Sequence, residues 1–454
     1  MKAFRATDGD AVLRAAEARG LSHVSLGCVD WDGRLRAKHY SVAALAAAFA
    51  HGLAMTTTIF AQDVADRPIE LGPFEDAARG YPDGRLELDP RSARNAPYDS
   101  GGEGLLVLGD FAAPYADYCP RALLKRELAR YQASGGALRG GYELEFRLLH
   151  ETPHSLAAKS ATELSFAPAF ERMYGLVDQA ASAPFLHELE QLATCMGVPL
   201  AAVHHEFQGL VEASLAVAEG VEIADHAVLV RSAAAIVAQR SQRLACFMAR
   251  VAPGLQSAGA HLNISLWLEQ GRRNVFFADG EESAALRAFI AGLQQYVPEL
   301  FLLFAPTVNS YKRFAPDCIA PRRNAWGVNN KTVAYRAVID EPTDARIEIR
   351  VPGADAHPHL VLAAVLAAGR AGLEAQLTPS ARCEGDATRD DAPAGPEFPR
   401  SFGAAIDMWR RSPFAIECFG EDFVDAYARS REWQLRQFES AVTDWELQTY
   451  ARSV

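Results

Sequence analysis

Three short segments of this chain alternate apolar residues with residues that carry charge or can bind a metal ion. In an extended strand successive side chains point to opposite faces, so the polar residues of each segment share one face and the apolar residues share the other. We therefore predict three strands of a sheet, each with one face packed on a core and the other face lined with ionisable groups. The segments are 142–146 (YELEF), 261–266 (HLNISL) and 346–351 (RIEIRV).

The charged faces of these segments favour either a metal site or a set of ion pairs. Glu143 and Glu145 stand on the same face of the first segment, and His261 and Glu348 lie on the other two. Because neighbouring carboxylates repel each other, such a pair is normally balanced by a divalent cation or by arginine. Each feature alone also fits a structural role, as a surface carboxylate pair, a core histidine or a ladder of salt bridges.

A second cluster and a run of arginines extend this chemistry. His204, His205 and Glu206 are followed closely by Glu212, a set that fits metal ligands or an exposed loop equally well. Oxygen ligands with one imidazole suit Mg²⁺ or Mn²⁺ better than zinc. Arginines in residues 310–336 suit phosphate and carboxylate groups, because a guanidinium binds both bidentately. Together these residues indicate a site for a divalent cation, a phosphate and a carboxylate substrate.

Length and composition favour a cytoplasmic globular protein. The 454 residues predict two or three domains, and the 49% hydrophobic content predicts an ordered chain. The formal net charge of -12 argues against nucleic acid as the main partner. The seven cysteines are scattered and indicate free thiols. No signal peptide and no run of about 18 apolar residues is evident, so we expect no membrane span.

Periodicity and turn residues predict the order of the elements. A hairpin is expected over residues 24–38, with its turn at Asp32-Gly33, and a strand over 105–108. A domain boundary is expected between residues 113 and 114. The segment 378–400, rich in proline, glycine and aspartate, is expected to form an exposed loop. Helices are expected over 11–20, 120–133, 168–196 with a break at Pro184, 221–243 and the C-terminal segment.

Short sequence motifs, in the same order over nearly the whole chain, resemble those of the glutamine synthetase superfamily. Residues 304–313, reading FAPTVNSYKR, are close to the glutamate-binding segment of that family. The segments 141–146 and 346–352 resemble its first and last metal-binding strands. Other motifs similar to those of the family occur at residues 30–38, 80–83, 119–121, 356–360, 398–401 and 442–446.

The resemblance implies an α+β fold with two domains. Residues 1–113 would form a small N-terminal β-grasp domain. Residues 114–454 would form a large C-terminal catalytic domain with a curved antiparallel sheet flanked by helices. The resemblance also implies a homododecamer of two hexameric rings, with each active site between neighbouring subunits.

Two divalent cations, Mg²⁺ or Mn²⁺, are implied when the family's ligands are carried over residue by residue. One cation would be held by Glu145, Glu206 and Glu212, and the other by Glu143, His261 and Glu348.

The resemblance also implies residues that bind glutamate and ATP. Arg313 and Arg350 match arginines that grip the glutamate carboxylate and the reacting γ-group, and Lys331 stands where the family stabilises the transferring phosphoryl group. Arg336 and Arg346 match residues that face ATP phosphates, and Ser265 matches one near the adenine.

The implied chemistry is phosphorylation of a carboxylate by ATP, followed by attack of an amine on the acyl phosphate. Ile319 stands where ammonia-using members carry an acidic residue on a mobile flap, and residues 55–63, MTTTIFAQD, resemble members that ligate larger amines. An apolar flap suits an amine with a carbon body, whereas ammonium needs anionic ligands. We therefore predict ligation of glutamate to such an amine, with an ordinary glutamine synthetase as the alternative.

Several positions depart from the family pattern. The interval from Glu206 to Glu212 is one residue shorter than usual, which leaves either Glu206 or His205 as the ligand at that corner. These departures keep open a third alternative, a catalytically silent relative with a structural or regulatory role. The remaining departures are Lys331 for an arginine, Gln256-Ser257 for an Asn-Gly pair and Asn263 for a second histidine.

Overall fold

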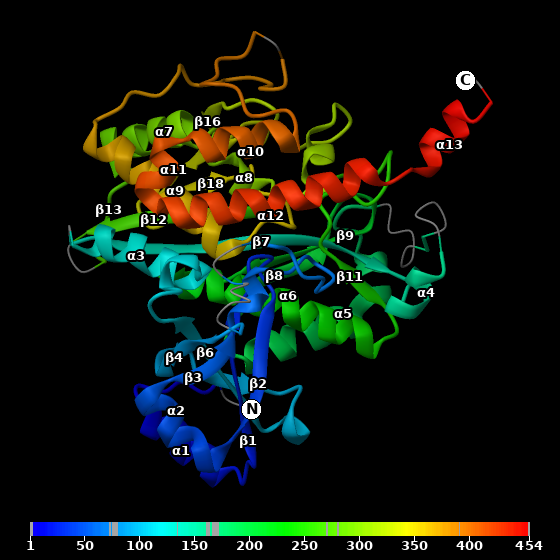
Figure 1. The fold of residues 1–454 in the computed structure, drawn as a ribbon. Helices are drawn as coiled ribbons and strands as arrows, with labels where there is room; N and C mark the ends of the chain where they lie inside the picture. Colours follow the sequence, from blue (N-terminus) through cyan, green and yellow to red (C-terminus); the bar gives the residue numbers. More distant parts are fainter. Residues whose placement is uncertain are drawn as a thin grey trace.

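Two sheets divide the chain in sequence order (Figure 1). The computed structural model describes residues 3–452 except 72–73, 75–79, 134, 160–163, 166–171, 269–270, 279–280 and 390. The first sheet lies within residues 23–111 and the second within residues 137–349. The predicted domain boundary between residues 113 and 114 falls in the interval between them.

Within the described residues, the first sheet has six strands in the order β2-β1-β6-β4-β3, with β5 paired to β6. β1 and β6 are parallel, and the other pairs are antiparallel. Helices α1 (Gly9–Ala18) and α2 (Leu45–His51) lie beside this sheet (Figure 1). The strands are β1 (His23–Val29), β2 (Leu35–Ser41), β3 (Leu53–Thr56), β4 (Asp83–Leu88), β5 (Arg94–Ala96) and β6 (Gly104–Phe111).

The second sheet has ten strands within the described residues, and its main path is β16-β17-β18-β12-β7-β9-β8. The pairs are antiparallel except β16 with β17 at one edge, which is parallel. Strands β14 (Phe277–Ala278) and β15 (Glu281–Glu282) form a separate pair. The ten strands are β7 (Ala137–Leu149), β8 (Leu200–His205), β9 (Leu210–Leu215), β10 (Ala218–Glu219), β11 (Leu244–Cys246), β12 (Ala260–Leu268), β13 (Arg273–Asn274), β16 (Trp326–Val328), β17 (Tyr335–Val338) and β18 (Arg346–Ile349).

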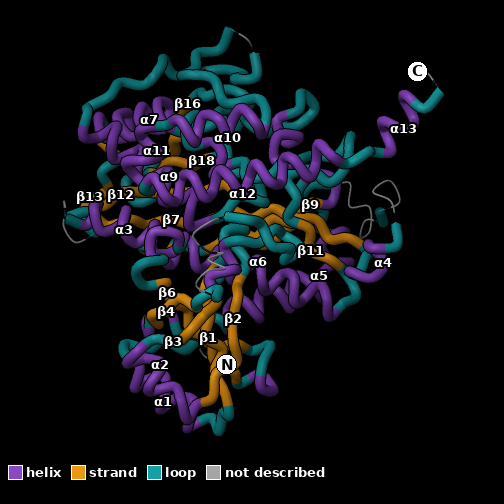
Figure 2. The backbone as a smooth tube through the Cα atoms, viewed as in Figure 1, coloured by secondary structure: helices purple, strands orange, loops and turns teal. Residues whose placement is uncertain are grey.

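Helices flank the second sheet. In the view of Figure 1, α7, α9, α10 and α12 lie above β7 and α5 and α6 lie below it, and Figure 2 shows these helices in purple around the orange strands. The helices are α3 (Pro120–Gln132), α4 (Pro153–Ala157), α5 (Leu176–Cys195), α6 (Glu222–Arg240), α7 (Ala284–Tyr296), α8 (Phe301–Phe304), α9 (Pro358–Glu374), α10 (Phe402–Arg411), α11 (Pro413–Phe419), α12 (Glu421–Ser440) and α13 (Asp444–Tyr450).

The apolar face of the central strand β7 packs on α9 and α5, as the alternation predicts. The Tyr142 hydroxyl donates a 2.7 Å hydrogen bond to the Pro358 carbonyl at the start of α9. The ring of Phe146 lies 6.2 Å from the ring of Phe185 on α5. These contacts leave the glutamates of β7 on the opposite face of the strand.

The predicted turn at Asp32-Gly33 is confirmed and contacts the larger part of the protein. The Asp30 carboxylate accepts hydrogen bonds from the backbone N–H groups of Asp32 and Arg34, at 3.0 and 2.9 Å. Gly33 has a φ of +75°, which glycine adopts without steric cost. Arg431 of α12 donates a 3.0 Å hydrogen bond to the Asp32 carboxylate, so the hairpin tip is fixed against α12.

A buried arginine links the first sheet to helix α6. Arg121, on α3, donates hydrogen bonds to Asp89, which follows β4, and to Asp110 of β6, at 2.9 and 3.0 Å. It also donates to Asp225 on α6 at 3.0 Å, and His359 of α9 lies 2.8 Å from the same carboxylate. Burial by itself disfavours the charged form, but Arg121 and His359 hold the pKa of Asp225 far below its ordinary value.

The predicted helix break at Pro184 is wrong, because α5 continues through this residue. Pro184 is exposed, whereas Phe185 and Leu189 are buried and anchor the helix on the core. Water can therefore solvate the carbonyl that lacks an amide partner, while packing preserves the helical path. The expected start of this helix, residues 168–171, lies outside the described residues.

The segment 378–400 has no helix or strand among its described residues, as predicted, but it is not simply exposed. Cys383 and Ala387 within the segment are buried. Gln294 of α7 donates a 2.9 Å hydrogen bond to Ser380. The segment therefore covers part of the core. All seven cysteines are free thiols, as predicted.

Candidate active site

Strand register brings the charged residues of the sequence segments together. β7 pairs with β12 so that Glu143 lies opposite His261, and Glu348 of β18 lies on the far side of β12. On the other side of β7, Glu145 lies opposite Glu212 of β9. Four neighbouring strands thus present one charged face.

Glu143, His261 and Glu348 form the first cluster. His261 Nδ1 lies 3.5 Å from Glu143 Oε2 and 3.6 Å from Glu348 Oε1. One ligand atom from each residue lies within 4.8 Å of the others. Two carboxylates with one imidazole form a donor set that suits Mg²⁺ or Mn²⁺.

Two arginines flank the first cluster. Arg336 donates a 2.9 Å hydrogen bond to Glu348 Oε2, and Arg350 donates to the other oxygen of the same carboxylate. Burial would raise the pKa of Glu348, but Arg350, His261 and Arg336 lower it to about 2. Glu348 is therefore ionised at neutral pH and keeps both guanidinium groups at the cluster.

His204, Glu206 and Glu212 form the second cluster, with ligand atoms within 4.8 Å of one another. His204 Nε2 lies 3.0 Å from Glu206 Oε1 and 3.7 Å from Glu212 Oε1. The Tyr174 hydroxyl donates a 2.8 Å hydrogen bond to Glu206. The hydrogen bond to Glu206 raises the pKa of His204.

The structure places Glu206, rather than His205, at this corner. His205 is fully buried and its side chain does not line the cavity that contains Glu206. The two residues lie at the end of β8, where the chain makes a short turn into β9, and the Glu206 N–H donates a 2.8 Å hydrogen bond to Leu210. The shortened interval therefore still presents Glu206 to the second cluster.

Negative charge accumulates between the clusters. Burial, together with the charges of Glu143 and Glu145, raises the pKa of Glu212 to about 7. Glu145 accepts a hydrogen bond from the Gly259 N–H. A divalent cation bound beside Glu212 would favour its ionised form and offset the charges of Glu143 and Glu145.

A cavity of about 480 Å³ encloses both clusters. Arg313, Arg336 and Arg350 line it together with Lys331, which is exposed. The remaining wall residues include Gln256, Ser257, Met173, Tyr174, Phe207, Leu210, Ile319 and Ala320.

Arg313 and Gln256 fix the walls of this cavity. Arg313 is buried and donates hydrogen bonds to the backbone carbonyls of Val351 and Arg350, at 2.9 and 3.0 Å. Burial lowers its pKa to about 10, so it stays charged at neutral pH. Gln256 donates to the Asp317 carbonyl at 3.0 Å and accepts from the Ile319 N–H at 3.1 Å. Gln256 thus holds the segment that carries Ile319.

Ser265 and Arg346 lie on the same charged face but do not line the cavity. Ser265 accepts a 2.8 Å hydrogen bond from the Trp267 indole. Arg346 donates to Asn263 at 3.0 Å, and Asn263 in turn donates to Glu143 at 3.0 Å. Asn263 therefore connects Arg346 to the first cluster.

Sequence reasoning missed the roles of two contributors to the site. Tyr174 lies before α5 and carried no pattern that could reveal it. Asn263 was noted only as a replacement, yet it positions Glu143. His204 was already in the candidate set with His205, Glu206 and Glu212, and in β8 it lies opposite Glu212.

Among the described residues, no helix combines the length and the apolar character needed to cross a membrane.

Comparison with known proteins shows which family this chain resembles. The model described as "Glutamine synthetase, catalytic domain" matches residues 117–450. Glutamate–isopropylamine ligase of Pseudomonas sp is 28% identical over 445 residues, which cover 96% of each chain. Type-1 glutamine synthetase 2 of Dictyostelium discoideum is 29% identical over 454 residues, covering 97% of this chain and 86% of the relative. Gamma-glutamylethanolamide synthetase GlnA4 of Streptomyces coelicolor is 31% identical over 444 residues, covering 96% and 94%.

A solved structure agrees with these sequence matches. The GmaS/ADP complex superposes with a TM-score of 0.83 at 25% identity, covering 97% of this chain and 99% of that chain. The predicted α+β fold of this superfamily is thereby confirmed. The chain belongs to the glutamine synthetase family.

Proposed function

We propose that this protein is an ATP-dependent ligase that joins the γ-carboxyl group of glutamate to a primary amine with a carbon body. The observation that carries the proposal is the composition of one cavity, which combines clustered carboxylates, cationic side chains and the apolar residues Ile319 and Ala320. Similarity to one ligase named for the amine isopropylamine and to another named for a gamma-glutamylethanolamide product supports the same conclusion.

The two clusters fit divalent cations by donor type and because Glu143, Glu145 and Glu212 lie side by side on one face. Bound Mg²⁺ or Mn²⁺ would neutralise phosphate oxygens. One cation would be held by Glu143, His261 and Glu348, and the other by Glu145, Glu206 and Glu212, with His204 beside it.

The cationic side chains would bind ATP and glutamate. Arg336 and Arg350 already converge on Glu348 and would contact the oxygens of the transferring phosphoryl group together with Lys331. Ser265 and Arg346 lie further along the same face, where the rest of the nucleotide would extend. Because phosphoryl transfer needs little covalent help from a protein, positioning and charge neutralisation carry most of the catalysis.

In the proposed reaction a γ-carboxylate oxygen of glutamate attacks the γ-phosphorus of ATP. The bond to the bridging oxygen breaks, and ADP leaves. The neutral amine then attacks the acyl carbon, inorganic phosphate leaves with the former carboxylate oxygen, and the amine loses a proton to a carboxylate or to water. Arg313 and Arg350 would hold glutamate during both steps.

The apolar wall is the basis for the amine preference. Met173, Tyr174, Phe207 and Ile319 line the cavity yet remain partly exposed in the free protein. The carbon body of an alkyl or aryl amine would cover such surface, whereas ammonium would gain nothing from it. The flap position of Ile319 carries no carboxylate that could bind ammonium.

Phosphate release with a panel of amines tests this function. The protein with ATP, Mg²⁺ and glutamate is offered isopropylamine, ethanolamine, putrescine, aniline or ammonium, each also without glutamate. We expect release that requires both glutamate and one of the carbon-bearing amines. Faster release with ammonium than with every other amine would favour an ordinary glutamine synthetase. Absence of ATP binding with Mg²⁺ or Mn²⁺ would leave a structural or regulatory protein.

We further propose a cytoplasmic homododecamer of two hexameric rings, with residues 1–113 of one subunit completing the site of its neighbour. Membership of the family supports this assembly. Size-exclusion chromatography with light scattering would test this assembly by measuring the molar mass of the protein in solution. A monomer or dimer at the protein concentration of the activity assay would contradict it.

A further inference from the structure

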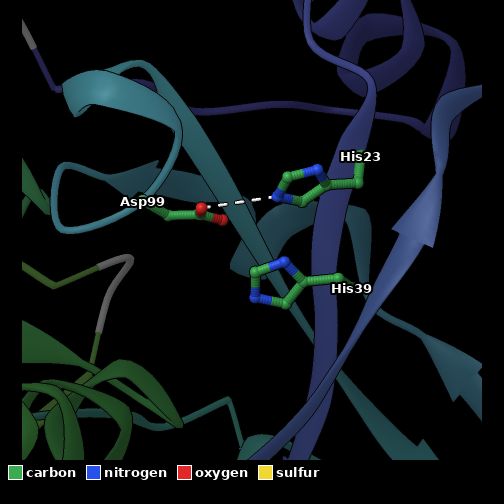
Figure 3. A group of neighbouring side chains, drawn as sticks. All are labelled: His23, His39 and Asp99. Atoms are coloured by element: carbon green, nitrogen blue, oxygen red, sulfur yellow. Dashed lines mark hydrogen bonds and ion pairs between the residues drawn. The ribbon is translucent and has the colours of Figure 1, made fainter.

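A second group of metal-competent side chains lies on the first sheet, away from the candidate active site. Figure 3 shows His23 on β1 and His39 on β2 with Asp99 facing them from the segment between β5 and β6. One ligand atom from each of the three residues lies within 4.8 Å of the others. None of the three lines the cavity that contains the glutamate clusters.

The sheet register places these groups on one face. β1 and β2 are antiparallel with Ser25 opposite His39, and His23 lies two residues from Ser25 on the same side of β1. His23 and His39 are therefore diagonal neighbours, a spacing that ring side chains can bridge. β6 pairs with β1, and the turn that precedes β6 brings Asp99 over this face.

The distances suit a small transition-metal ion. Because zinc lies about 2.0–2.1 Å from its oxygen and nitrogen ligands, two ligand atoms of a tetrahedral site are roughly 3.3 Å apart. His23 Nε2 lies 3.4 Å from Asp99 Oδ1. Ser25 also donates a 3.4 Å hydrogen bond to the other oxygen of Asp99, which helps to fix this carboxylate.

His39 needs one adjustment to join these two ligands. The rings of His23 and His39 are stacked, with centroids 4.4 Å apart and planes at 23°. An ion in the plane of both rings requires one of them to turn. His39 is exposed, whereas His23 and Asp99 are partly buried, so His39 can rotate without displacing core side chains. The partly buried pair is thus in place for the third ligand.

We propose that His23, His39 and Asp99 bind a transition-metal ion, with Zn²⁺ the preferred ion. Two imidazoles and one carboxylate favour zinc over Mg²⁺, whereas the glutamate clusters on the second sheet favour the opposite order. Ser25 and His39 also line a cavity of about 810 Å³ between the β1–β2 hairpin and α6. The fourth position of the ion would therefore face space that a water molecule can enter.

A bound ion would tie the β1–β2 hairpin to the turn before β6. A simple ion pair between His23 and Asp99 would not include His39. The number of Zn²⁺ ions bound by the His39→Ala variant therefore distinguishes the two arrangements.

Equilibrium dialysis with Zn²⁺ in excess Mg²⁺ tests the proposal on the full-length protein. The variants are His39→Ala and Asp99→Asn, with His51→Ala as the matched control, because His51 is an exposed histidine at the end of α2 in the same part of the chain. Any Zn²⁺ that enters the glutamate clusters is common to all four proteins. The difference between proteins therefore does not depend on the proposed ligase activity.

We expect the wild type and His51→Ala to bind one more Zn²⁺ per chain than His39→Ala and Asp99→Asn. We also expect Zn²⁺ to raise the unfolding temperature more in the first two proteins, because an ion that binds only the folded state stabilises it. Equal Zn²⁺ stoichiometry in the wild type and His39→Ala would overturn the proposal. Unfolding temperatures without Zn²⁺ show whether each variant is folded.

Discussion

Replacing Ile319 by glutamate should shift the amine preference of the protein toward ammonium. Ile319 lines the cavity and is held there by the hydrogen bond from its N–H to Gln256. The backbone of this segment does not depend on the isoleucine side chain. The Ile319→Glu variant therefore places a carboxylate at the same point of the wall while the other cavity residues remain.

The size of the change follows from two contributions. Ile319 keeps 48% of its surface exposed in the free protein. Because full burial of an isoleucine side chain is worth about 1.5–3 kcal/mol, covering the exposed half by a carbon body is worth about 1 kcal/mol. A carboxylate that accepts hydrogen bonds from ammonium adds about 1.5–3 kcal/mol. The preference should therefore shift by about 2.5–4 kcal/mol, or roughly 70- to 900-fold in the ratio of kcat/KM values.

The assay is phosphate release at saturating ATP and glutamate, with the best amine of the panel and with ammonium in separate titrations. Ile416→Glu is the matched control, because Ile416 on α11 is also partly exposed and does not line this cavity. We expect Ile416→Glu to behave as the wild type. A shift below about fivefold in Ile319→Glu, or an equal shift in the control, would refute the assigned role of the apolar wall.

Three further variants test the site and the stability of the fold. Glu348→Gln should lose at least about 100-fold in kcat/KM at fixed Mg²⁺, because Glu348 is both a candidate metal ligand and the charged partner of two arginines. The control Glu341→Gln, on an exposed turn, should keep the wild-type kcat/KM. Equal activities of the two variants would exclude Glu348 from the site. Arg121→Leu should lower the free energy of unfolding in urea by about 3–5 kcal/mol, because it leaves a buried aspartate without its main partner, and a loss below about 1 kcal/mol would contradict this. Burial, aided by a nearby arginine, holds the pKa of His226 at about 3. As the pH falls below about 6.5, His226 therefore binds a proton in the unfolded chain but not in the folded protein. Between about pH 6.5 and pH 3, His226 should lower the free energy of unfolding by up to about 1.4 kcal/mol for each pH unit. His226→Leu should flatten the pH profile by that amount, and an unchanged profile would refute the assignment.

The charged face of the second sheet could be predicted because a strand encodes its faces locally. The alternation in the sequence assigned Glu143 and Glu348 to faces of their strands without knowledge of their neighbours. The resemblance to the family then indicated which of these strands contribute ligands to the same metal ion. The resemblance also grouped Glu145 with Glu206 and Glu212, and the structure places Glu145 opposite Glu212. Neither source indicated that His204 would take the place of Glu145 in the tightest set of ligand atoms.

Features that depend on long-range contacts could not be predicted. Which of His204 and His205 faces the cavity depends on the pairing of β8 with β9, and two adjacent histidines give no local preference. Tyr174 reaches Glu206 from a segment distant in sequence. The unbroken helix at Pro184 shows tertiary packing overriding an intrinsic propensity.

Isotope transfer tests acyl phosphate formation most directly. Glutamate labelled with ¹⁸O in its γ-carboxyl group is incubated with ATP, Mg²⁺ and the preferred amine, and both the inorganic phosphate and the amide product are analysed by mass spectrometry. If a carboxylate oxygen attacks the γ-phosphorus and leaves with phosphate, each phosphate carries one ¹⁸O and the product is the γ-glutamyl amide. Unlabelled phosphate released in step with amide formation would contradict the proposed mechanism.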